Sequence, residues 1–164
     1  MNVGISKFSA KGSVVAPPSK SLAHRLLIAA ALKNGRTVVK NVGYSADVTR
    51  TRDCLAALGA KITVENGNAA VYGIQNSAAN DFFGEKDFIL NTGESGSTLR
   101  FLMPVAAALG IRAEFICDSG LLCRPIDEMI NVLSAHGEKI EKTNRGYLLS
   151  GKIHPGKYVI DGTV

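Results

Sequence analysis

Tryptophan is absent from this chain of 164 residues, and only 6% of the residues are aromatic. Hydrophobic residues still make up 46% of the chain, so its core must be built mainly from Ala, Leu, Ile and Val. Charged residues make up 20%, a share typical of globular proteins. A chain of this length can form one ordinary domain. The composition therefore excludes a disordered segment and predicts a folded domain.

The sequence also lacks a long apolar run. Its longest apolar stretches, such as Leu26–Leu32, are too short to span a bilayer, and its first six residues contain no apolar core of a signal peptide. The three cysteines, Cys54, Cys117 and Cys123, are odd in number and lack the spacing of metal ligands. This number and spacing of cysteines favour a reducing compartment. We expect a soluble, cytoplasmic protein with no membrane segment.

A cluster of basic residues is missing as well. Lys and Arg outnumber Asp and Glu by 19 to 14, which gives a net charge of +5, but the basic residues are scattered singly. Nucleic-acid binding usually requires a basic cluster with aromatic residues for stacking. Several of the basic residues lie beside Gly/Ser loops instead. The pattern favours small phosphorylated or carboxylated partners over nucleic acid.

An internal repeat organises the chain. The polar stretch Ser19–Arg25 precedes the apolar run Leu26–Leu32, and Gly93–Arg100 precedes the similar run Phe101–Leu109. Corresponding landmarks are roughly 75 to 78 residues apart; the two arginines, for example, differ by 75 positions. Each copy reads as a small-residue loop that enters an Ala/Leu-rich helix.

A second helix follows in each copy. Asp47 is a suitable N-cap for the first of these helices, and Pro125 suits the first turn of its counterpart. Both are expected to end at a glycine in the left-handed conformation, Gly59 in the first copy and Gly137 in the second.

Extended segments complete each copy. A hairpin is predicted around Asn66-Gly67, because this dipeptide favours a tight turn between strands. Further strands are expected at residues 37–40 and 113–116, and a second hairpin at 139–149. The predicted order is strand, helix, strand, helix, strand, strand, given twice. The fold class is therefore α/β (α+β), with repeated βαβαββ units.

The boundaries of these units follow from the landmarks. Unit one covers about 13–75 and unit two about 84–152, and a third begins at 156–164, where Gly156–Gly162 resembles the expected opening strand Gly12–Pro18. A repeat needs neighbours to bury its apolar face. We therefore expect a piece of a longer protein; the alternative is a natural two-repeat domain with a short tail.

Two of the loops are suited to bind anions. The first amides of a helix have no partner within the helix, and the helix dipole favours negative charge there. Lys20 and Ser21 precede one helix, and Gly96 and Ser97 the other. Such a loop is more often only a cap, and Gly93–Thr98 lacks the Gly-Lys-Ser/Thr ending of a nucleotide-binding P-loop. The recurrence of the element favours a functional role.

Four stretches resemble one family, the 5-enolpyruvylshikimate-3-phosphate synthases. Pro18–Arg25 is similar to its Gly-Ser-Lys-Ser/Thr-x-x-x-Arg signature, and Gly93–Arg100 to its Gly-Asn-Ala-Gly-Thr-x-x-Arg signature. Ser45–Val48 resembles the Ser-x-Asp-Val element, and Arg124–Ile126 the Arg-Pro-Met/Ile element. Four elements in the right order over nearly the whole chain are far more specific than any one of them.

The resemblance implies an inverse α/β barrel of βαβαββ units, of which this chain holds about two of the three that form one domain. It implies that residues 1–12 form an opening strand and hinge of the C-terminal domain and that 13–164 form an incomplete N-terminal domain. The implied reaction transfers an enolpyruvyl group from phosphoenolpyruvate to the 5-hydroxyl of shikimate 3-phosphate and releases phosphate. No metal and no organic cofactor are implied.

The resemblance also assigns roles residue by residue. Lys20, Gly96 and Arg124 would contact phosphoenolpyruvate, and glyphosate would compete at Gly96. Ser21 and Arg25 would hold shikimate 3-phosphate. Supporting positions are Asp47, Ser97 and Arg100. No catalytic acid or base is expected in this chain, because in the family these groups come mostly from the C-terminal half, a required partner; the chain alone is expected to be inactive.

One residue differs from the family signature, and two alternative assignments are considered. Glu94 stands where the family usually has Asn, so its carboxylate must point away from the anion site or pair with a cation. UDP-N-acetylglucosamine enolpyruvyl transferase shares the architecture, but its reactive Cys lies several residues before its Arg-Pro, whereas Cys123 directly precedes Arg124. The other rival is a non-catalytic anion-binding module with the same fold.

Overall fold

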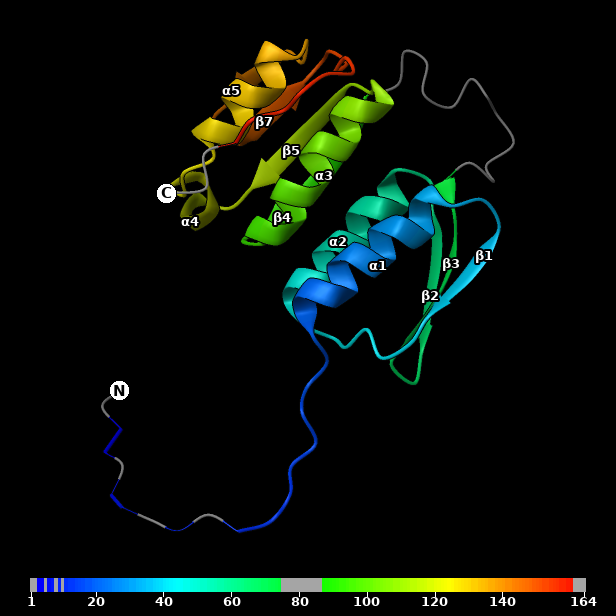
Figure 1. Cartoon of the computed structure of the whole chain (residues 1–164), viewed down its shortest axis with the longest axis vertical. Coiled ribbons are helices and arrows are strands. Elements are labelled where there is room, and N and C mark those ends of the chain that lie inside the picture. The colour runs from blue at the N-terminus through cyan, green and yellow to red at the C-terminus, as the bar shows by residue number, and fades with distance from the viewer. Residues whose placement is uncertain (1–2, 5, 8, 10, 75–86, 161–164) are drawn as a thin grey trace.

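Two similar groups of helices and strands make up the protein. The computed structural model describes residues 3–4, 6–7, 9, 11–74 and 87–160 (Figure 1). The first group consists of α1 (Lys20–Leu32), β1 (Arg36–Val39), α2 (Ala46–Ala57), β2 (Lys61–Glu65) and β3 (Asn68–Tyr72). The second consists of β4 (Phe88–Gly93), α3 (Gly96–Leu109), β5 (Ala113–Cys117), α4 (Ser119–Leu122), α5 (Asp127–Ala135), β6 (Ile140–Lys142) and β7 (Gly146–Leu149).

Turn residues end the elements as the sequence predicts. Asn66 and Gly67 both have positive φ, 48° and 75°, which is the backbone of a type I′ turn between β2 and β3. Gly59 and Gly137 have φ values of 101° and 104° just after α2 and α5. These conformations are strained for residues with a Cβ, so glycine is favoured at both helix ends.

Each group contains one sheet. The first sheet has the strand order β1-β3-β2 and is antiparallel throughout. The second has the order β4-β5-β7-β6, in which β5, β7 and β6 repeat the first arrangement and β4 is added parallel to β5. The βαβαββ order is thus complete in the second group. The predicted α/β class with repeated units is confirmed.

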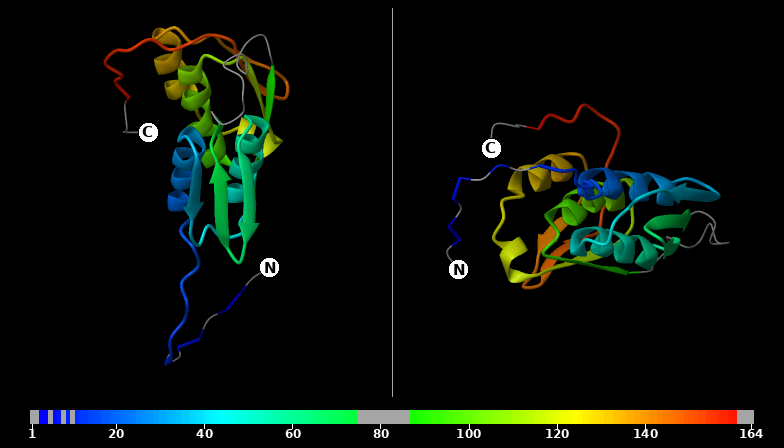
Figure 2. Two further views of the ribbon diagram at one scale, coloured as in Figure 1. Left: turned by 90° about the vertical axis from the view of Figure 1, so that its right-hand side faces the viewer. Right: turned by 90° about the horizontal axis from the view of Figure 1, so that it is seen from below.

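The expected opening strand of the first unit is not formed. Residues 13–18 pair with no strand in the described part of the chain, and Figures 1 and 2 show this segment running away from the helices. Val14 and Val15 are 95% and 99% exposed. Pro17 and Pro18 contribute to this, because neither has an amide hydrogen for a ladder. The prediction of a strand here was wrong.

Two helix starts also differ from the prediction. The N-cap of α2 is Ser45, whose hydroxyl accepts from the Val48 amide, and Asp47 lies in the first turn instead. The helix after Pro125 begins at Asp127. The short helix α4, which the sequence pattern did not predict, precedes it.

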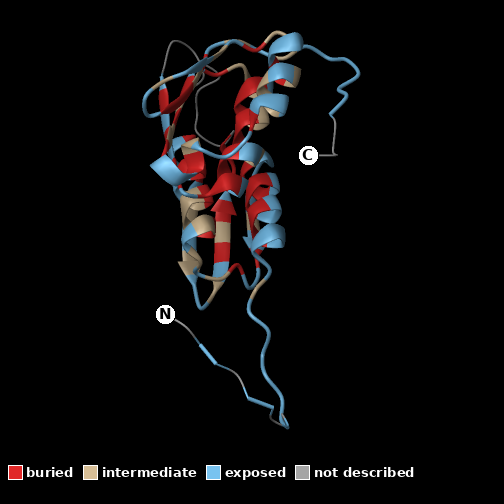
Figure 3. Ribbon diagram, turned by 90° about the vertical axis from the view of Figure 1, so that its left-hand side faces the viewer, coloured by how far each residue is buried: buried red, intermediate tan, exposed pale blue. Residues whose placement is uncertain are grey.

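The interior is built from aliphatic side chains and two phenylalanines. The helices α1, α2 and α3 contact one another, and α2 also packs on β4 of the second group. Leu27, Leu55 and Leu99 are fully buried, one from each of these helices. Figure 3 shows the buried positions along the strands and the inward faces of the helices. Within the described residues, no helix has the length and apolar character that crossing a membrane requires.

Candidate anion-binding site

Serine side chains cap three helices in the same way. Ser19, Ser45 and Ser95 precede α1, α2 and α3, and the Oγ of each accepts a hydrogen bond of 3.3 Å from the backbone amide three residues further on. Each cap satisfies one of the amides that lack a partner within the helix. The other first-turn amides remain to interact with a side chain, water or an anion, as the sequence analysis anticipated.

Lys20 and Asp47 join the starts of α1 and α2. The Lys20 Nζ donates to Asp47 Oδ2 at 2.7 Å, and the two side chains are 58% and 35% exposed. The hydrogen bond from Lys20 is the largest cause that lowers the pKa of Asp47 below its usual value. The Asp47 carboxylate also lies in the first turn of α2, where the helix dipole favours negative charge. The ammonium group is therefore held across two helix N-termini.

A buried chain of hydrogen bonds connects α1, α2 and α3 beneath this pair. The Thr98 hydroxyl donates to the Asp47 carbonyl at 3.2 Å and lies 2.7 Å from both Ser95 Oγ and Thr51 Oγ1. Thr51 Oγ1 in turn lies 2.7 Å from His24 Nδ1. The side chains of Ser95, Thr98, Thr51 and His24 are all buried.

The donors in this chain can be assigned one by one. Thr98 has a single hydroxyl hydrogen; with that hydrogen on the Asp47 carbonyl, Thr98 accepts from Thr51. Thr51 has then used its own hydrogen and must accept from His24 Nδ1–H. Burial is the largest cause that lowers the pKa of His24, which favours the neutral ring. A neutral ring with its hydrogen on Nδ1 fits this arrangement and gives His24 a structural role.

Arg25 projects from α1 toward α3. Its guanidinium carbon lies 4.9 Å from the centroid of the Phe101 ring, and its Nη1 donates to the Ser21 carbonyl at 2.9 Å. A cation over an aromatic face is attracted by the negative potential of the ring. This contact fixes the direction of Arg25, while Ser21 lies exposed in the first turn of α1.

Two guanidinium groups converge on Gly96. A Cβ placed on this glycine would lie 3.2 Å from Arg100 Nη1 and 3.3 Å from Arg124 Nη1. Arg100 is held by its Nη2, which donates to the Pro125 carbonyl at 3.0 Å. The absence of a side chain at Gly96 thus lets both cations approach the backbone at the start of α3. Ser97, the next residue, lies exposed on the same turn.

Glu94 pairs with this cationic group. Its Oε1 accepts from the Gly120 amide at 3.1 Å, and its Oε2 lies 3.8 Å from Arg124 Nη2. A carboxylate beside an anion site must either point away or pair with a cation. The structure shows the second arrangement.

An open hollow of about 660 Å³ lies beside the first turn of α1. Its walls come from the segments before and within the starts of α1 and α2: Pro17, Pro18, Ser19, Lys20, Ser21, Val42, Gly43, Tyr44 and Ser45. Tyr44 is held in place because its hydroxyl accepts from the Gly67 amide at 2.8 Å. The hollow gives a ligand access to Lys20 and Ser21.

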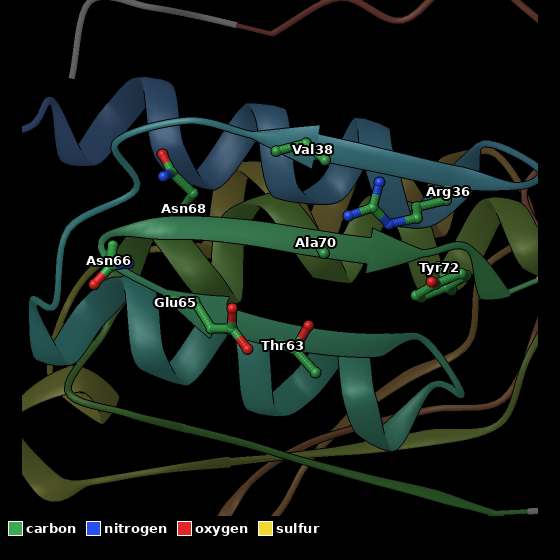
Figure 4. A pocket seen from close by; sticks show the side chains of 8 residues that line it. All are labelled: Arg36, Val38, Thr63, Glu65, Asn66, Asn68, Ala70 and Tyr72. Carbon is green, nitrogen blue, oxygen red and sulfur yellow. The ribbon is translucent and has the colours of Figure 1, made fainter.

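A second hollow, of about 350 Å³, lies on the face of the first sheet that points away from the helices (Figure 4). Its lining residues alternate along β1, β2 and β3, and the helices lie behind the sheet in this view. Arg36 and Glu65 contribute one charge of each sign. This face has neither a helix N-terminus nor a converging set of cations, and it takes no part in the candidate site.

The predicted site residues thus fall into two adjoining groups. Lys20 and Asp47 lie on one side and Gly96, Arg100 and Arg124 on the other, and the link between them is Thr98, which contacts Asp47 from the first turn of α3. The roles of Thr51, Thr98 and Phe101 were not predicted from the sequence. For Thr51 a signal was present, because this polar residue shares the buried face of α2 with Val48 and Leu55.

Comparisons with known proteins identify the family of this chain. The sequence model of the family described as EPSP synthase (3-phosphoshikimate 1-carboxyvinyltransferase) matches residues 6–159. The chain is 37% identical over 169 residues to the 3-phosphoshikimate 1-carboxyvinyltransferase of Clostridium beijerinckii. This alignment covers 99% of this chain and 38% of that protein. The chain is 35% identical to the enzyme of the same name from Clostridium kluyveri, with 99% of this chain and 37% of that protein covered. The chain therefore spans less than two fifths of these relatives.

A solved structure of an EPSP synthase has a similar fold. The EPSP synthase from Acinetobacter baumannii superimposes with a TM-score of 0.73 over 90% of this chain and 34% of that one, at 21% sequence identity. At this identity the likeness establishes the fold only. Because the family match extends over nearly all of the sequence, the chain belongs to the EPSP synthase family.

Proposed function

We propose that this chain provides part of the active site of an enzyme that transfers the enolpyruvyl group of phosphoenolpyruvate to the 5-hydroxyl of shikimate 3-phosphate and releases phosphate. The observation that supports this most directly is that α1, α2 and α3, each capped by a serine, pack together, with Lys20 paired to Asp47 and with Arg100 and Arg124 converging on Gly96. The relatives that are named for this activity are more than twice as long as this chain.

The proposed roles are those that the family resemblance implies for these positions. Lys20, Gly96 and Arg124 bind phosphoenolpyruvate, and glyphosate competes for the same place. Ser21 and Arg25, on the exposed start of α1, hold shikimate 3-phosphate. Three residues support these groups: Asp47 orients Lys20, Arg100 adds charge beside Gly96, and Ser97 lies on the same turn.

The chemistry explains why cations are needed. Both substrates are multiply anionic, and bringing them side by side costs Coulomb energy unless fixed positive groups surround them. Protonation of the methylene carbon of phosphoenolpyruvate develops positive character at C2. The shikimate hydroxyl attacks this carbon and loses its proton, and the tetrahedral adduct then expels phosphate. A general acid and a general base are required in addition to the cations.

Three acid or base side chains at the site are engaged with neighbours. Asp47 is paired with Lys20, Glu94 is bound to the Gly120 amide and near Arg124, and His24 is buried in the hydroxyl chain. We therefore propose that the chain by itself binds anions weakly and does not catalyse the reaction. The C-terminal half of the enzyme would supply the missing groups, with residues 1–12 as part of that half and 13–164 as an incomplete N-terminal domain.

Cysteine chemistry supports a cytoplasmic location as part of the proposal. Cys54, Cys117 and Cys123 are all free thiols. Reduced cysteines are the ordinary state in the cytosol.

Calorimetry with shikimate 3-phosphate tests the binding role. We expect weak binding that is lost in Lys20→Ala and in Arg25→Ala, and retained in the control Arg36→Ala, which removes an equal charge from the outer face of the first sheet. Equal binding by the wild-type chain and all three variants would overturn the assignment of Lys20 and Arg25 to the binding site. A phosphate-release assay then tests activity: turnover should require addition of the C-terminal portion of the Clostridium beijerinckii relative, and turnover by the chain alone would contradict the proposed division of labour.

The engagement of Asp47, Glu94 and His24 with neighbours favours one second candidate, a non-catalytic anion-binding module. This candidate predicts the same loss of binding in the Lys20 and Arg25 variants but no phosphate release under any combination of chains. The complementation assay therefore separates it from the enzyme.

A further inference from the structure

Glu94 makes a contact across the site that the family signature does not predict. It lies between β4 and α3, directly before the N-cap Ser95. Its carboxylate reaches the neighbouring segment, where Oε1 accepts from the Gly120 amide at 3.1 Å and Oε2 lies 3.8 Å from Arg124 Nη2. One side chain thus contacts both the backbone of α4 and the guanidinium that follows it.

Gly120 is what makes this contact possible. A Cβ at this position would lie 2.8 Å from Glu94 Oε2 and 3.0 Å from Oε1. Such distances are too short, so any larger residue would displace the carboxylate or the α4 backbone. The sequence therefore contains a matched pair, an acid at 94 and a glycine at 120.

The contact places Arg124 in the site. Arg124 Nη1 lies 3.3 Å from the Cβ position of Gly96, and Arg100 Nη1 lies 3.2 Å from the same point. Two guanidinium groups this close repel one another, and a nearby carboxylate offsets that repulsion. The same carboxylate weakens the attraction that Arg124 offers to an incoming anion. The effect is moderate because Glu94 and Arg124 are each about half exposed.

We propose that Glu94 is a positioning residue for Arg124 and also its internal counter-ion, so that this side chain sets the affinity of the Gly96 site for anions. The carboxylate orients Arg124 toward Gly96 through the α4 backbone, at the cost of weaker anion binding than a neutral residue would allow. The identity of the anion as phosphoenolpyruvate rests on the proposed function, but the positioning does not.

Two variants of the full chain separate the two parts of this role. Glu94→Gln keeps an oxygen that accepts from the Gly120 amide and removes the charge, whereas Glu94→Ala removes both. Glu65→Gln, on the outer face of the first sheet, is the control for the change in net charge. The readout is two-dimensional nitrogen–proton NMR of the Gly120 amide, the Gly96 amide and the Arg124 Nε, during titration with inorganic phosphate.

We expect Glu94→Gln to bind phosphate about threefold to fivefold more tightly than the wild-type chain, as for a half-exposed ion pair. Its Gly120 amide should stay hydrogen-bonded. Glu94→Ala should move the Gly120 and Arg124 resonances toward solvent-exposed values and bind more weakly than Glu94→Gln. The control should bind like the wild type.

Three results would overturn the inference: equal phosphate affinity in the wild type and both Glu94 variants, an equal gain in affinity in Glu65→Gln, or unmoved Gly120 and Arg124 resonances in Glu94→Ala. Failure of the proposed function gives a different result. In that case phosphate would behave as expected, but phosphoenolpyruvate would neither shift the Gly96 amide nor compete with phosphate.

Discussion

The hydroxyl groups of Thr51 and Thr98 lie 2.7 Å apart in the interior, although the residues are 47 positions apart in the sequence. Thr51 belongs to α2 of the first repeat and Thr98 to α3 of the second. Their hydrogen bond fixes the start of α3 against α2, directly below the ion pair of Lys20 and Asp47. The candidate anion site therefore depends on a contact between repeats.

Replacement of Thr51 by Val should destabilise the protein. The valine has nearly the same shape but leaves the fully buried Thr98 and His24 groups each short of one partner. A buried polar group without a partner costs about 1 to 3 kcal/mol. Urea denaturation should show a loss of this size. Thr51→Ser is the matched control, since it keeps the hydroxyl, and equal losses in both variants would show that packing and not hydrogen bonding is responsible.

His24 should make the stability of the protein depend on pH. Burial lowers the pKa of its ring in the folded state below the ordinary value of 6.5, so the unfolded chain binds a proton more readily. The contribution of neutral His24 is therefore complete above pH 6.5 and is lost as the pH falls through the lowered folded value. Denaturation curves between pH 7.5 and about 5 should show a decline in the free energy of unfolding that is smaller in His24→Gln. A decline of equal size in both proteins would contradict the assignment.

Addition of a methyl group at Gly96 should weaken anion binding without unfolding the protein. The new Cβ would lie 3.2 to 3.3 Å from the guanidinium nitrogens of Arg100 and Arg124, so both side chains must move by a few tenths of an ångström. Gly96 is helical with no positive φ, and alanine is the better helix former, which offsets part of the strain. We expect Gly96→Ala to reduce phosphate affinity severalfold in an NMR titration, with little change in melting temperature. Ala108→Ser, at an exposed position of the same helix, should change neither quantity.

The three thiols should react at very different rates. Burial raises the pKa of Cys54 to about 12 and also raises that of Cys117, and both side chains are enclosed in the core. Cys123 is exposed beside Arg124. A thiol reagent at pH 8 should therefore modify one cysteine quickly and the other two only after denaturation. Rapid modification of two or three thiols in the native protein would show that the interior opens more readily than its packing implies.

Local patterns in the sequence were sufficient for most of the elements. The Asn66-Gly67 turn and the glycine ends of α2 and α5 agree with the predictions, and the positions of β1 and β5 agree to within one residue. These features depend on neighbours a few positions apart, so a short stretch of sequence contains the necessary information. The family signatures likewise directed attention to the two loops, and the roles of their residues stay predictions.

Tertiary packing decided what those local patterns left open. The sequence favoured Asp47 as a cap, but in the folded chain Ser45 caps α2 and Asp47 binds Lys20, which is 27 positions away. The apolar segment at Val14 and Val15 suggested a strand, yet a strand forms only where another strand is present to pair with it.

The sequence by itself determined the repeat, the fold class and the residue types at the candidate anion site. Only the tertiary structure decided that Thr51 and Thr98 join the repeats and that Glu94 is held against Gly120 and Arg124. The physical reason is distance along the chain. Turns and caps are set by residues close in sequence, whereas these contacts exist only once the packing of α2 on β4 and α3 has brought distant segments together.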